Sequence, residues 1–427
     1  PGMQVTAPAG WSERVTHHIE LPAQPVLATD AVHYVGEPVA AIVAQTRNAA
    51  LDAAERVEQS VAETPPILDP VAAAEPGHAR LHRGLGSNVM ADMTVGKGDV
   101  DAALAAAPRQ LTRTISHHRY AASPIECRAV AAQFDRRDGV LTVWSTTQVV
   151  HWVQAQIARA LELPQSCVRI IAPDVGGGFG VKGHVYPEEL VVAWMAMRLG
   201  RPVRWVEQRQ EHLAGATHAR DQIHELSIGF DESGRMLALR DSAWIDSGAF
   251  CPVGAGVAYN TPAHMLGPYD IAHFSSRTRV VATNKSPNAP YRGAGRPEAV
   301  QVMERAMDLV AVALGMEPAA VRFVNLIKPH QMPYPVGLPY RDGHPIVYDS
   351  GDYVCALEQA IAAIGGVESF RQTQRQAAAD GRLVGLGLGC YTEGTGVGPF
   401  EAAQVRIDKT GSIVVSVGAC AQGQGHE

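Results

Sequence analysis

Residues 168–205 read VRIIAPDVGGGFGVKGHVYPEELVVAWMAMRLGRPVRW, and this stretch places five glycines between a short apolar run and an amphipathic segment. The β-branched, apolar residues 168–172 predict a buried strand. Pro187 suits the first turn of a helix, which the apolar residues predict as far as Leu199 before Gly200 ends it. The stretch therefore predicts a unit of strand, glycine loop, helix and strand.

The glycines have two explanations from the residues alone. Gly178, Gly180 and Gly183 satisfy the G-x-G-x-x-G pattern of dinucleotide-binding folds, and Glu207 follows near the place of an acid that binds ribose. In that fold the third glycine lies in the first helical turn, whereas here Pro187 sets the helix start several residues later. No second β-α-β pattern follows, so a structural glycine-rich turn is the stronger of these two explanations.

Three further stretches accompany the glycines along the chain. They read WSTTQ at 144–148, PYRGAGRPEA at 290–299 and QGQGHE at 422–427. Together with residues 176–180, and in order and approximate spacing, they resemble the large, molybdenum-binding subunit of the molybdenum hydroxylases, the family of xanthine dehydrogenase, aldehyde oxidoreductase and carbon monoxide dehydrogenase. The resemblance covers nearly the whole chain.

The resemblance implies a mixed α/β, or α+β, fold in several domains. Residues 1–75 would be part of an N-terminal α/β domain of the hammerhead type, and the weakly periodic residues 76–98 predict a linker. A first molybdenum-cofactor-binding domain is expected at 99–340 and the start of a second at 341–427. We therefore expect the chain to be incomplete at both ends.

Local signals predict the elements of these domains. Asp231 to Gly234 form a turn sequence between two strands. Pro297 and Gly315 delimit a helix at 298–314 with one apolar face. The other predicted strands lie at 26–28, 32–35, 39–43, 140–145, 203–206 and 237–239, and the other predicted helices at 48–61, 100–107, 149–161, 353–364 and 368–378.

The resemblance also assigns the site residues. In the family the metal is held by an organic dithiolene and not by side chains, so no metal ligand is expected here. By match to the motifs, the amide of Gln148 would donate to an oxo ligand of molybdenum, Arg292 would favour negative charge on the substrate, and Ala294 would line the substrate wall. From the residues alone, Gln148 is equally explained as a helix cap or a surface residue.

The cofactor implied is molybdopterin with molybdenum, in its cytosine dinucleotide form. Phe179 and Gly180 would present backbone groups to the ligand shell of the metal, and the segment from Gln422 to Gly425 would bind the pterin or phosphate end. The complete set expected to bind the cofactor is Gly177, Gly178, Phe179, Gly180, Gly293, Gln422, Gly423, Gln424 and Gly425.

The substrate is narrowed by two small residues. Ala294 stands where purine-oxidising relatives carry an aromatic residue that stacks on a flat ring, and Gly183 stands where many relatives carry a glutamate. The resemblance therefore favours aldehydes or N-heterocycles over purines. Gly293 stands where carbon monoxide dehydrogenases carry a copper-binding cysteine, so carbon monoxide is not the expected substrate.

Several tempting residues are better explained by structure. His117 and His118 are neighbours in a predicted strand and point to opposite faces, so they cannot bind one ion together. His212, His218 and His224 lack a short ligand spacing. Glu126, near these residues, is interpreted as structural, with a place at the site as the alternative.

Composition narrows the classes of binding partner that we expect. The 427 residues are 46% hydrophobic and carry a net charge of −7 without a basic run, which argues against nucleic acid or an anionic membrane as partner. Six cysteines form no C-x-x-C pair, so no iron–sulfur cluster is expected in this chain, and electrons would pass to an iron–sulfur [2Fe–2S] subunit and a flavin (FAD) subunit in a dimer of heterotrimers.

The sequence also gives expectations for the cellular compartment and for the source of the general base. The scattered cysteines and the lack of a membrane-spanning run favour the cytoplasm, and the start at Pro1 without methionine leaves the periplasm open. The family's general base is a glutamate expected beyond Glu427, with Glu393 and Glu427 as alternatives, so the rest of a longer subunit or a split partner would supply it. A non-catalytic scaffold of the same fold, which would purify without molybdenum, is the alternative function.

Overall fold

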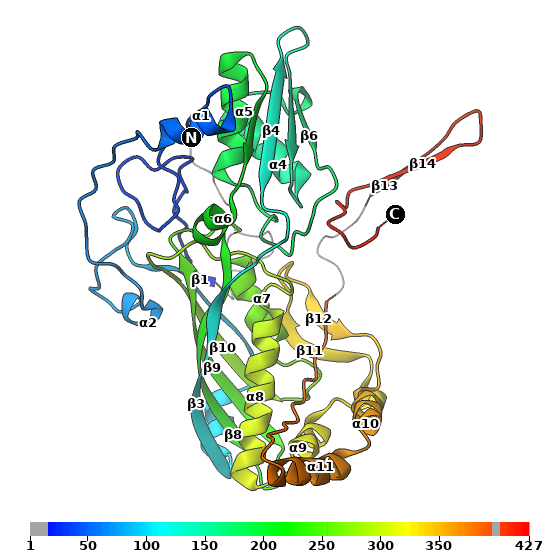
Figure 1. Ribbon diagram of the computed structural model, residues 1–427. Helices are drawn as coiled ribbons and strands as arrows, with labels where there is room; N and C mark the ends of the chain where they lie inside the picture. Colours follow the sequence, from blue (N-terminus) through cyan, green and yellow to red (C-terminus); the bar gives the residue numbers. More distant parts are fainter. Residues whose placement is uncertain (1–15, 254, 395–401, 427) are drawn as a thin grey trace.

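The computed structural model describes residues 16–253, 255–394 and 402–426. Two sheets of different size organise this part of the chain, one in each half of the molecule (Figure 1). The glycine-rich stretch includes a strand of the smaller sheet, and the PYRGAGRPEA stretch leads into a helix that packs on the larger one. The two stretches lie where the halves meet.

The larger sheet has six strands in the order β1-β2-β10-β9-β8-β3. All neighbours are antiparallel except β9 and β10. The strands are β1 (Thr16–Ile19), β2 (Val89–Lys97), β3 (Arg109–Ala121), β8 (His218–Phe230), β9 (Met236–Gly248) and β10 (His273–Ala282).

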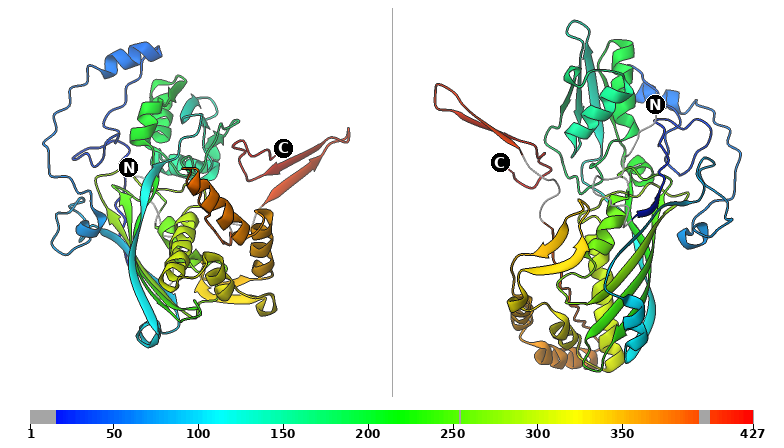
Figure 2. Two further views of the ribbon diagram at one scale, coloured as in Figure 1. Left: turned by 60° about the horizontal axis from the view of Figure 1, so that its bottom comes forward. Right: turned by 180° about the vertical axis from the view of Figure 1, so that it is seen from behind.

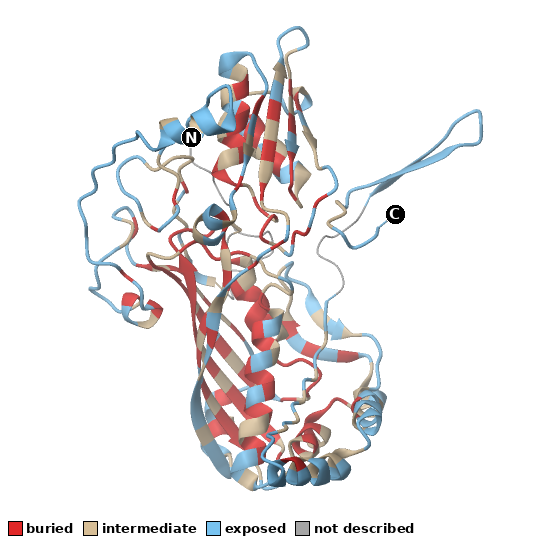
Figure 3. Cartoon of the chain, in the orientation of Figure 1, coloured by how far each residue is buried: buried red, intermediate tan, exposed pale blue. Residues whose placement is uncertain are grey.

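Helix α8 (Arg296–Leu314) runs along one face of this sheet, with α7 (Gly256–His264) beside its first turns (Figure 1). Its apolar side chains, among them Val302, Met303 and Val310, pack against buried residues of the sheet. Figure 3 shows this interface as the most continuous buried layer of the molecule. The N-terminus of α8 is thereby fixed at the junction between the two halves.

The smaller sheet has the order β6-β5-β4-β7, in which only β5 and β6 are parallel. Its strands are β4 (Ala129–Asp135), β5 (Val140–Ser145), β6 (Val168–Ile171) and β7 (Val203–Val206). Helices α4 (Val150–Ala160) and α5 (Pro187–Leu199) pack on it around buried Val153, Leu190 and Ala193. The predicted unit of strand, glycine loop, helix and strand is therefore confirmed.

The remaining elements surround the two sheets. Figure 2 shows the hairpin of β13 (Ala403–Ile407) and β14 (Ile413–Val417) projecting away from the body, with every residue of both strands exposed. The others are α1 (Arg47–Ala54), α2 (Pro70–Ala73), α3 (Val100–Ala106), η1 (Gln165–Cys167), α6 (Arg209–Gly215), α9 (Pro318–Asn325), η2 (Pro329–Gln331), β11 (Tyr334–Pro339), β12 (Pro345–Tyr348), α10 (Tyr353–Ala363) and α11 (Val367–Ala379).

Most predictions of fold class and of helix position were confirmed. The architecture is mixed α/β, and the helices predicted at 100–107, 149–161, 298–314, 353–364 and 368–378 form within one or two residues of those bounds. The predicted turn between β8 and β9 forms because Asp231 Oδ1 accepts from the backbone N–H groups of Ser233 and Arg235. The six cysteines are free thiols. Among the described residues, no helix combines the length and apolar character that crossing a bilayer requires.

The N-terminal predictions were wrong in their details. Residues 26–28, 32–35 and 39–43 form no regular strand, and the helix predicted at 48–61 ends at Ala54. Helix α1 buries no residue, and Val35 is 82% exposed. Tyr34 is buried against Phe250 and Val26 packs against the core of the smaller sheet, so these segments do reach apolar layers. A strand also needs a partner strand to be stable, and none of the three segments pairs with one among the described residues.

The prediction of a linker at 76–98 was also wrong in part. Residues 89–97 form β2, which pairs with both β1 and β10 and buries Met90, Met93 and Val95. Gly84, Gly86, Gly96 and Gly98 interrupt the sequence pattern, and the partners of β2 lie far away in the chain. The division of the chain into domains stays a prediction.

Candidate functional site

Two loops meet at the junction between the sheets. The glycine loop (176–183) follows β6, and the arginine loop (290–296) precedes α8. The backbone N–H of Arg292 donates to the carbonyl oxygen of Phe179 at 3.0 Å. A Cβ on Gly180 would collide with the carbonyl of Pro290. The loops therefore approach each other so closely that glycine is required at 180.

Gln148 joins the other two motifs to the glycine loop. It follows β5, and its Oε1 accepts from the N–H of Gly180 at 2.8 Å. Its Nε2 donates to Oε1 of Gln422 at 2.9 Å. A Cβ on Gly178 would lie 2.5 Å from the amide carbon of Gln148. The WSTTQ, glycine, PYRGAGRPEA and QGQGHE stretches therefore contact one another in space.

The arginine loop has an unusual backbone. Gly293, Ala294 and Gly295 have φ of 100°, 48° and 94°, which is a left-handed region that costs energy for alanine. Asn260 of α7 donates to the carbonyl of Ala294 at 2.9 Å, and Thr261 of α7 donates to the carbonyl of Gly295 at 3.1 Å. Contacts from a neighbouring helix thus hold a conformation that the loop would not adopt alone.

The predicted catalytic residues line this junction. Arg292 is exposed, and Gln148 and Ala294 are partly buried. Phe179 is 44% exposed with φ of 53°, so an aromatic ring also reaches the surface of the site. Of the backbone groups of Phe179 and Gly180, the N–H of Gly180 donates to Gln148 and the carbonyl of Phe179 accepts from Arg292. Their contact with the ligand shell of the metal stays a prediction.

The predicted cofactor residues are brought together only in part. Gly177, Gly178 and Gly293 lie in the two loops, and Gln422 contacts Gln148. Gly423, Gln424 and Gly425 are exposed, and nothing lies within 4 Å of a Cβ built on either glycine.

Glu126, which we interpreted as structural, supports the glycine loop through an ion pair. Glu126 Oε2 accepts from Lys182 Nζ and from the N–H of Gly176, both at 2.8 Å. The side chain of Lys182 is 1% exposed, and burial lowers its pKa although the contact with Glu126 opposes the shift. Lys182 was not among the predicted residues, because the one signal it gives in the sequence is a charge inside a glycine-rich segment.

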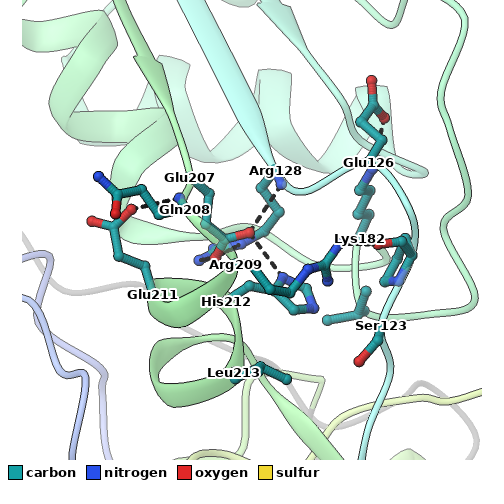
Figure 4. Close-up of polar contacts among 12 residues, drawn as sticks. Ser123, Glu126, Arg128, Lys182, Glu207, Gln208, Arg209, Glu211, His212 and Leu213 are labelled. Atoms are coloured by element: carbon teal, nitrogen blue, oxygen red, sulfur yellow. Dashed lines mark hydrogen bonds and ion pairs between the residues drawn. The ribbon is translucent and has the colours of Figure 1, made fainter. Parts of the chain in front are cut away.

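A buried cluster of charges underlies α6 and β7 (Figure 4). Burial alone would raise the pKa of Glu207, and its contacts with His212 and Arg128 outweigh burial and lower the pKa to about 2. The guanidinium of Arg128 also lies 3.5 Å from the centre of the Tyr186 ring. Glu207 is therefore an internal counter-ion and not an acid that binds ribose.

The same cluster includes the one group of potential metal ligands among the described residues, Cys127, Glu207 and His212. Nδ1 of His212 lies 2.8 Å from Glu207 Oε2, and its Nε2 lies 2.7 Å from the carbonyl oxygen of Ala122. Both ring nitrogens therefore lie against oxygen atoms of the protein, and an ion could bind only by displacing one of these contacts. The cluster serves packing and charge balance.

A buried carboxyl lies next to the glycine loop on α5. Glu189 accepts from Ser145 Oγ at 2.6 Å and from the N–H of Tyr186 at 3.0 Å. Burial raises the pKa of Glu189 to about 7, although these hydrogen bonds lower it. The nearby His184 is also buried, which lowers its pKa to about 3.

The other residues considered as metal ligands or as the general base are two histidines of β3 and two glutamates near the end of the chain. His117 is buried and His118 is exposed, as expected for neighbours in a strand. Glu393 pairs with Arg296 at 3.3 Å. Glu427, the other candidate for the general base, lies outside the described residues.

The chain is similar to known molybdenum-containing proteins. Two models described as molybdopterin cofactor-binding domains match the chain, one at residues 81–326 and the other at 360–427. The gamma subunit of the 6-hydroxypseudooxynicotine dehydrogenase complex of Paenarthrobacter nicotinovorans is 36% identical over 97% of this chain and 52% of its own length. The carbon monoxide dehydrogenase large chain of Hydrogenophaga pseudoflava is 33% identical over 94% of this chain and 53% of its own.

Solved structures agree with the sequence matches. Quinoline 2-oxidoreductase from Pseudomonas putida 86 superposes with a TM-score of 0.90 at 33% identity, over 100% of this chain and 55% of that one. The Cu,Mo-containing carbon monoxide dehydrogenase superposes with a TM-score of 0.83 at 31% identity, over 96% of this chain and 56% of that one. The chain thus spans about half the length of the curated relatives it matches.

Proposed function

This chain belongs to the molybdopterin cofactor-binding family of molybdenum hydroxylase large subunits, and from this premise we propose that it forms part of an enzyme that hydroxylates an N-heterocycle or an aldehyde. The observation that carries the proposal is the contact of four separated motifs at one place, with Gln148 between Gly180 and Gln422. Contacts across such distances in sequence are expected of a built site and not of four unrelated turns.

The residues at the junction fit a large anionic cofactor. Glycines let the loops come within backbone contact, and Gly423 and Gly425 leave an open backbone beside them. The exposed guanidinium of Arg292 adds a permanent positive charge. The proposed binding set is therefore Gly177, Gly178, Phe179, Gly180, Gly293, Gln422, Gly423, Gln424 and Gly425, for molybdopterin in its cytosine dinucleotide form.

When bound, the cofactor supplies the molybdenum centre at which R–H and water become R–OH, two protons and two electrons. Gln148 has two amide hydrogens, and its contact with Gln422 uses one, so the other can donate to the ligand shell of the metal. Arg292 stabilises negative charge that develops on the substrate, and Ala294 leaves room beside it. We propose that a glutamate outside the described residues takes a proton, because Arg296 already pairs with Glu393.

An N-heterocycle is the favoured substrate of the two. Relatives matched over nearly the whole chain include proteins named nicotine 6-hydroxylase large subunit and quinoline 2-oxidoreductase. The small side chain of Ala294 leaves the wall open, and Phe179 offers an exposed aromatic ring for a flat substrate. The two aldehyde oxidoreductases matched by structure are 20% and 22% identical and support the fold alone.

Carbon monoxide is not proposed as the substrate, although two relatives bear that name. Position 293 is glycine with φ of 100°, and a Cβ there would lie 2.5 Å from the ring of Pro297. A cysteine at this place would therefore be strained, and glycine itself offers no thiolate to copper. Copper found beside molybdenum in the purified enzyme would contradict this assignment.

Electrons are proposed to leave through an iron–sulfur [2Fe–2S] subunit and an FAD subunit, in a dimer of heterotrimers. The six cysteines of this chain are free, and none stands in a C-x-x-C pair. Free thiols also favour a reducing cytoplasm as the location.

The proposal is tested on the complex purified with this chain. Molybdenum, released pterin, iron and flavin are measured, and turnover is screened with N-heterocycles and aldehydes against an artificial dye acceptor. We expect all four components and oxidation of an N-heterocycle. A stable complex without molybdenum or pterin would instead identify a non-catalytic scaffold.

A further inference from the structure

Arg220 contacts the arginine loop at three points. Its Nη1 donates to the carbonyl of Tyr291 at 3.3 Å, and its Nη2 donates to the carbonyl of Arg292 at 3.0 Å. Nη1 also pairs with Glu298 Oε2 in the first turn of α8 at 2.8 Å. The guanidinium lies 5.1 Å from the centre of the Tyr291 ring. One side chain thus contacts the peptide groups on both sides of Arg292 and the helix that follows.

The backbone that carries Arg220 is strained. Arg220 and Asp221 have φ of 65° and 58°, and non-glycine residues adopt such angles rarely. They stand just before Gln222, where the pairing of β8 with β9 begins. Strain of this kind persists only where the surroundings fix it, and it commonly accompanies a functional constraint.

The surroundings do fix this bend. Asn288 donates to the carbonyl of Arg220 at 2.6 Å. Arg119 Nε donates to Asp221 at 2.7 Å, and Lys285 Nζ lies 3.3 Å from the same carboxylate. The two consecutive positive φ angles direct Arg220 toward the arginine loop, and three side chains stabilise them.

The contact with Glu298 is buried, so removal of Arg220 would leave an uncompensated buried carboxylate. The side chains of Arg220 and Glu298 are 11% and 1% exposed. Oε1 of Glu298 has no hydrogen-bond partner among the described residues. Arg220 is therefore the cation that compensates a buried carboxylate, and the planar guanidinium can do this while it donates to two carbonyls.

We propose that Arg220 is a positioning residue for the proposed hydroxylation, which fixes the peptide groups of Tyr291 and Arg292 so that the side chain of Arg292 meets the substrate in one orientation. This inference rests on the proposed function, because it concerns the same site. It also predicts a property of the loop that can be measured without turnover.

The test compares two conservative variants in the purified complex. In Arg220→Lys the charge next to Glu298 is kept, but a single ammonium cannot replace the planar fork at both carbonyls. The matched control is Arg322→Lys. Arg322 is a buried arginine of α9 that pairs at 2.9 Å with Glu304 of α8, the helix that also carries Glu298. Molybdenum content, kcat, KM and amide hydrogen exchange of residues 290–296 are measured for both.

In Arg220→Lys we expect exchange in residues 290–296 to accelerate and kcat/KM to fall by about tenfold or more, the effect of losing a charge-assisted hydrogen bond. Molybdenum content should stay at the wild-type level. Arg322→Lys should lower thermal stability and leave exchange of the arginine loop unchanged.

Two results would overturn the inference: wild-type exchange and kcat/KM in Arg220→Lys, or an equal acceleration of loop exchange in Arg322→Lys. Failure of the proposed function looks different, since the wild-type complex would then contain no molybdenum and oxidise no substrate. In that case the exchange measurement still decides whether Arg220 fixes the loop.

Discussion

The glycine loop and the arginine loop meet at one place but are held by opposite kinds of group. Hydrogen-bond acceptors hold the glycine loop by its N–H groups, with Glu126 on Gly176 and Gln148 on Gly180. Hydrogen-bond donors hold the arginine loop by its carbonyls, among them Asn260 and Thr261. An added methyl group would clash in both loops, at Gly180 as at Gly293 and Gly295. The loops therefore differ in which backbone groups their supports contact, N–H groups in the first and carbonyl groups in the second.

This difference teaches which changes each loop should tolerate. In the glycine loop an added methyl group meets backbone or side-chain atoms at once. In the arginine loop the loss of one donor leaves a single carbonyl without its partner while the others remain. We therefore expect abrupt losses from a methyl group added at a glycine and graded losses from the removal of a single donor.

The largest effect is expected for Gly180→Ala. Position 180 has φ of 96°, and the new Cβ would collide with the carbonyl of Pro290, so both the backbone angle and the contact between the loops are disfavoured. We expect a stability loss of about 3 kcal/mol or more together with loss of bound molybdenum. Thermal unfolding and metal analysis of the complex measure the two effects.

A matched control separates steric fit from backbone strain. Gly139, in the turn between β4 and β5, has φ of 67° and nothing within 4 Å of a built Cβ. Gly139→Ala should cost only about 1 kcal/mol and keep molybdenum. Equal effects of the two substitutions would mean that contact between the loops is not what requires glycine at 180.

The same difference explains what the sequence could predict. The glycine loop and the helix that begins at Arg296 were predicted because glycine, proline and the apolar period act locally. Arg220 was not, because it carries no local signal and acts on residues about 70 positions later through the bend before Gln222. Resemblance to a family assigned Gln148 and Arg292 to one site, which periodicity alone could not do.

Strand β2 was missed in the sequence because its stability depends on a strand that is distant in the chain. Its residues form a ladder with β10, and no local pattern shows that this partner exists. The strands predicted at 26–28, 32–35 and 39–43 show the reverse error, since a suitable composition without a partner forms no strand. Non-local pairing therefore accounts for both errors.

The second-largest effect is expected on the pH dependence of stability. A titrating carboxyl lies beside the glycine loop, whereas the donors that hold the arginine loop do not titrate between pH 4.5 and 7. Burial raises the pKa of Glu189, next to the glycine loop, to about 7 from an ordinary value of 4.5. A carboxyl with a raised pKa in the folded state contributes stability that is complete below pH 4.5 and is lost as pH rises through about 7. Hydrogen-bond donors such as Asn260 and Thr261, which hold the arginine loop, do not titrate in this range.

We therefore expect Glu189→Gln to remove a fall in unfolding free energy of roughly 3 kcal/mol between pH 4.5 and 7. Chemical denaturation across this range measures it. Glu211→Gln is the matched control, because Glu211 has the same capping role on α6, accepting from Gln208 N–H at 2.7 Å, but is exposed. A Glu189→Gln variant with the wild-type pH profile would mean that the carboxyl titrates as an ordinary one.

The third effect is on turnover. Gln148→Ala removes the amide that contacts both Gly180 and Gln422. We expect turnover to fall by roughly 10²-fold, the scale for removing one preorganised donor, while molybdenum content stays nearly unchanged. Gln154→Ala, which removes an amide of α4 that binds the carbonyl of Val168, should leave turnover as it is. Full activity in Gln148→Ala would make that residue purely structural.

The smallest effect is expected for Thr261→Val. The hydroxyl of Thr261 donates to the carbonyl of Gly295 at 3.1 Å, and valine keeps the shape of the side chain without the donor. Only one of several contacts on the arginine loop is lost, because Asn260 and Arg220 still hold neighbouring carbonyls. We expect a stability loss of about 1 kcal/mol, normal molybdenum content and little change in kcat, as measured by thermal unfolding, metal analysis and dye reduction. A loss as abrupt as that of Gly180→Ala would show that the arginine loop has no independent contacts and that the two loops respond to substitution in the same way.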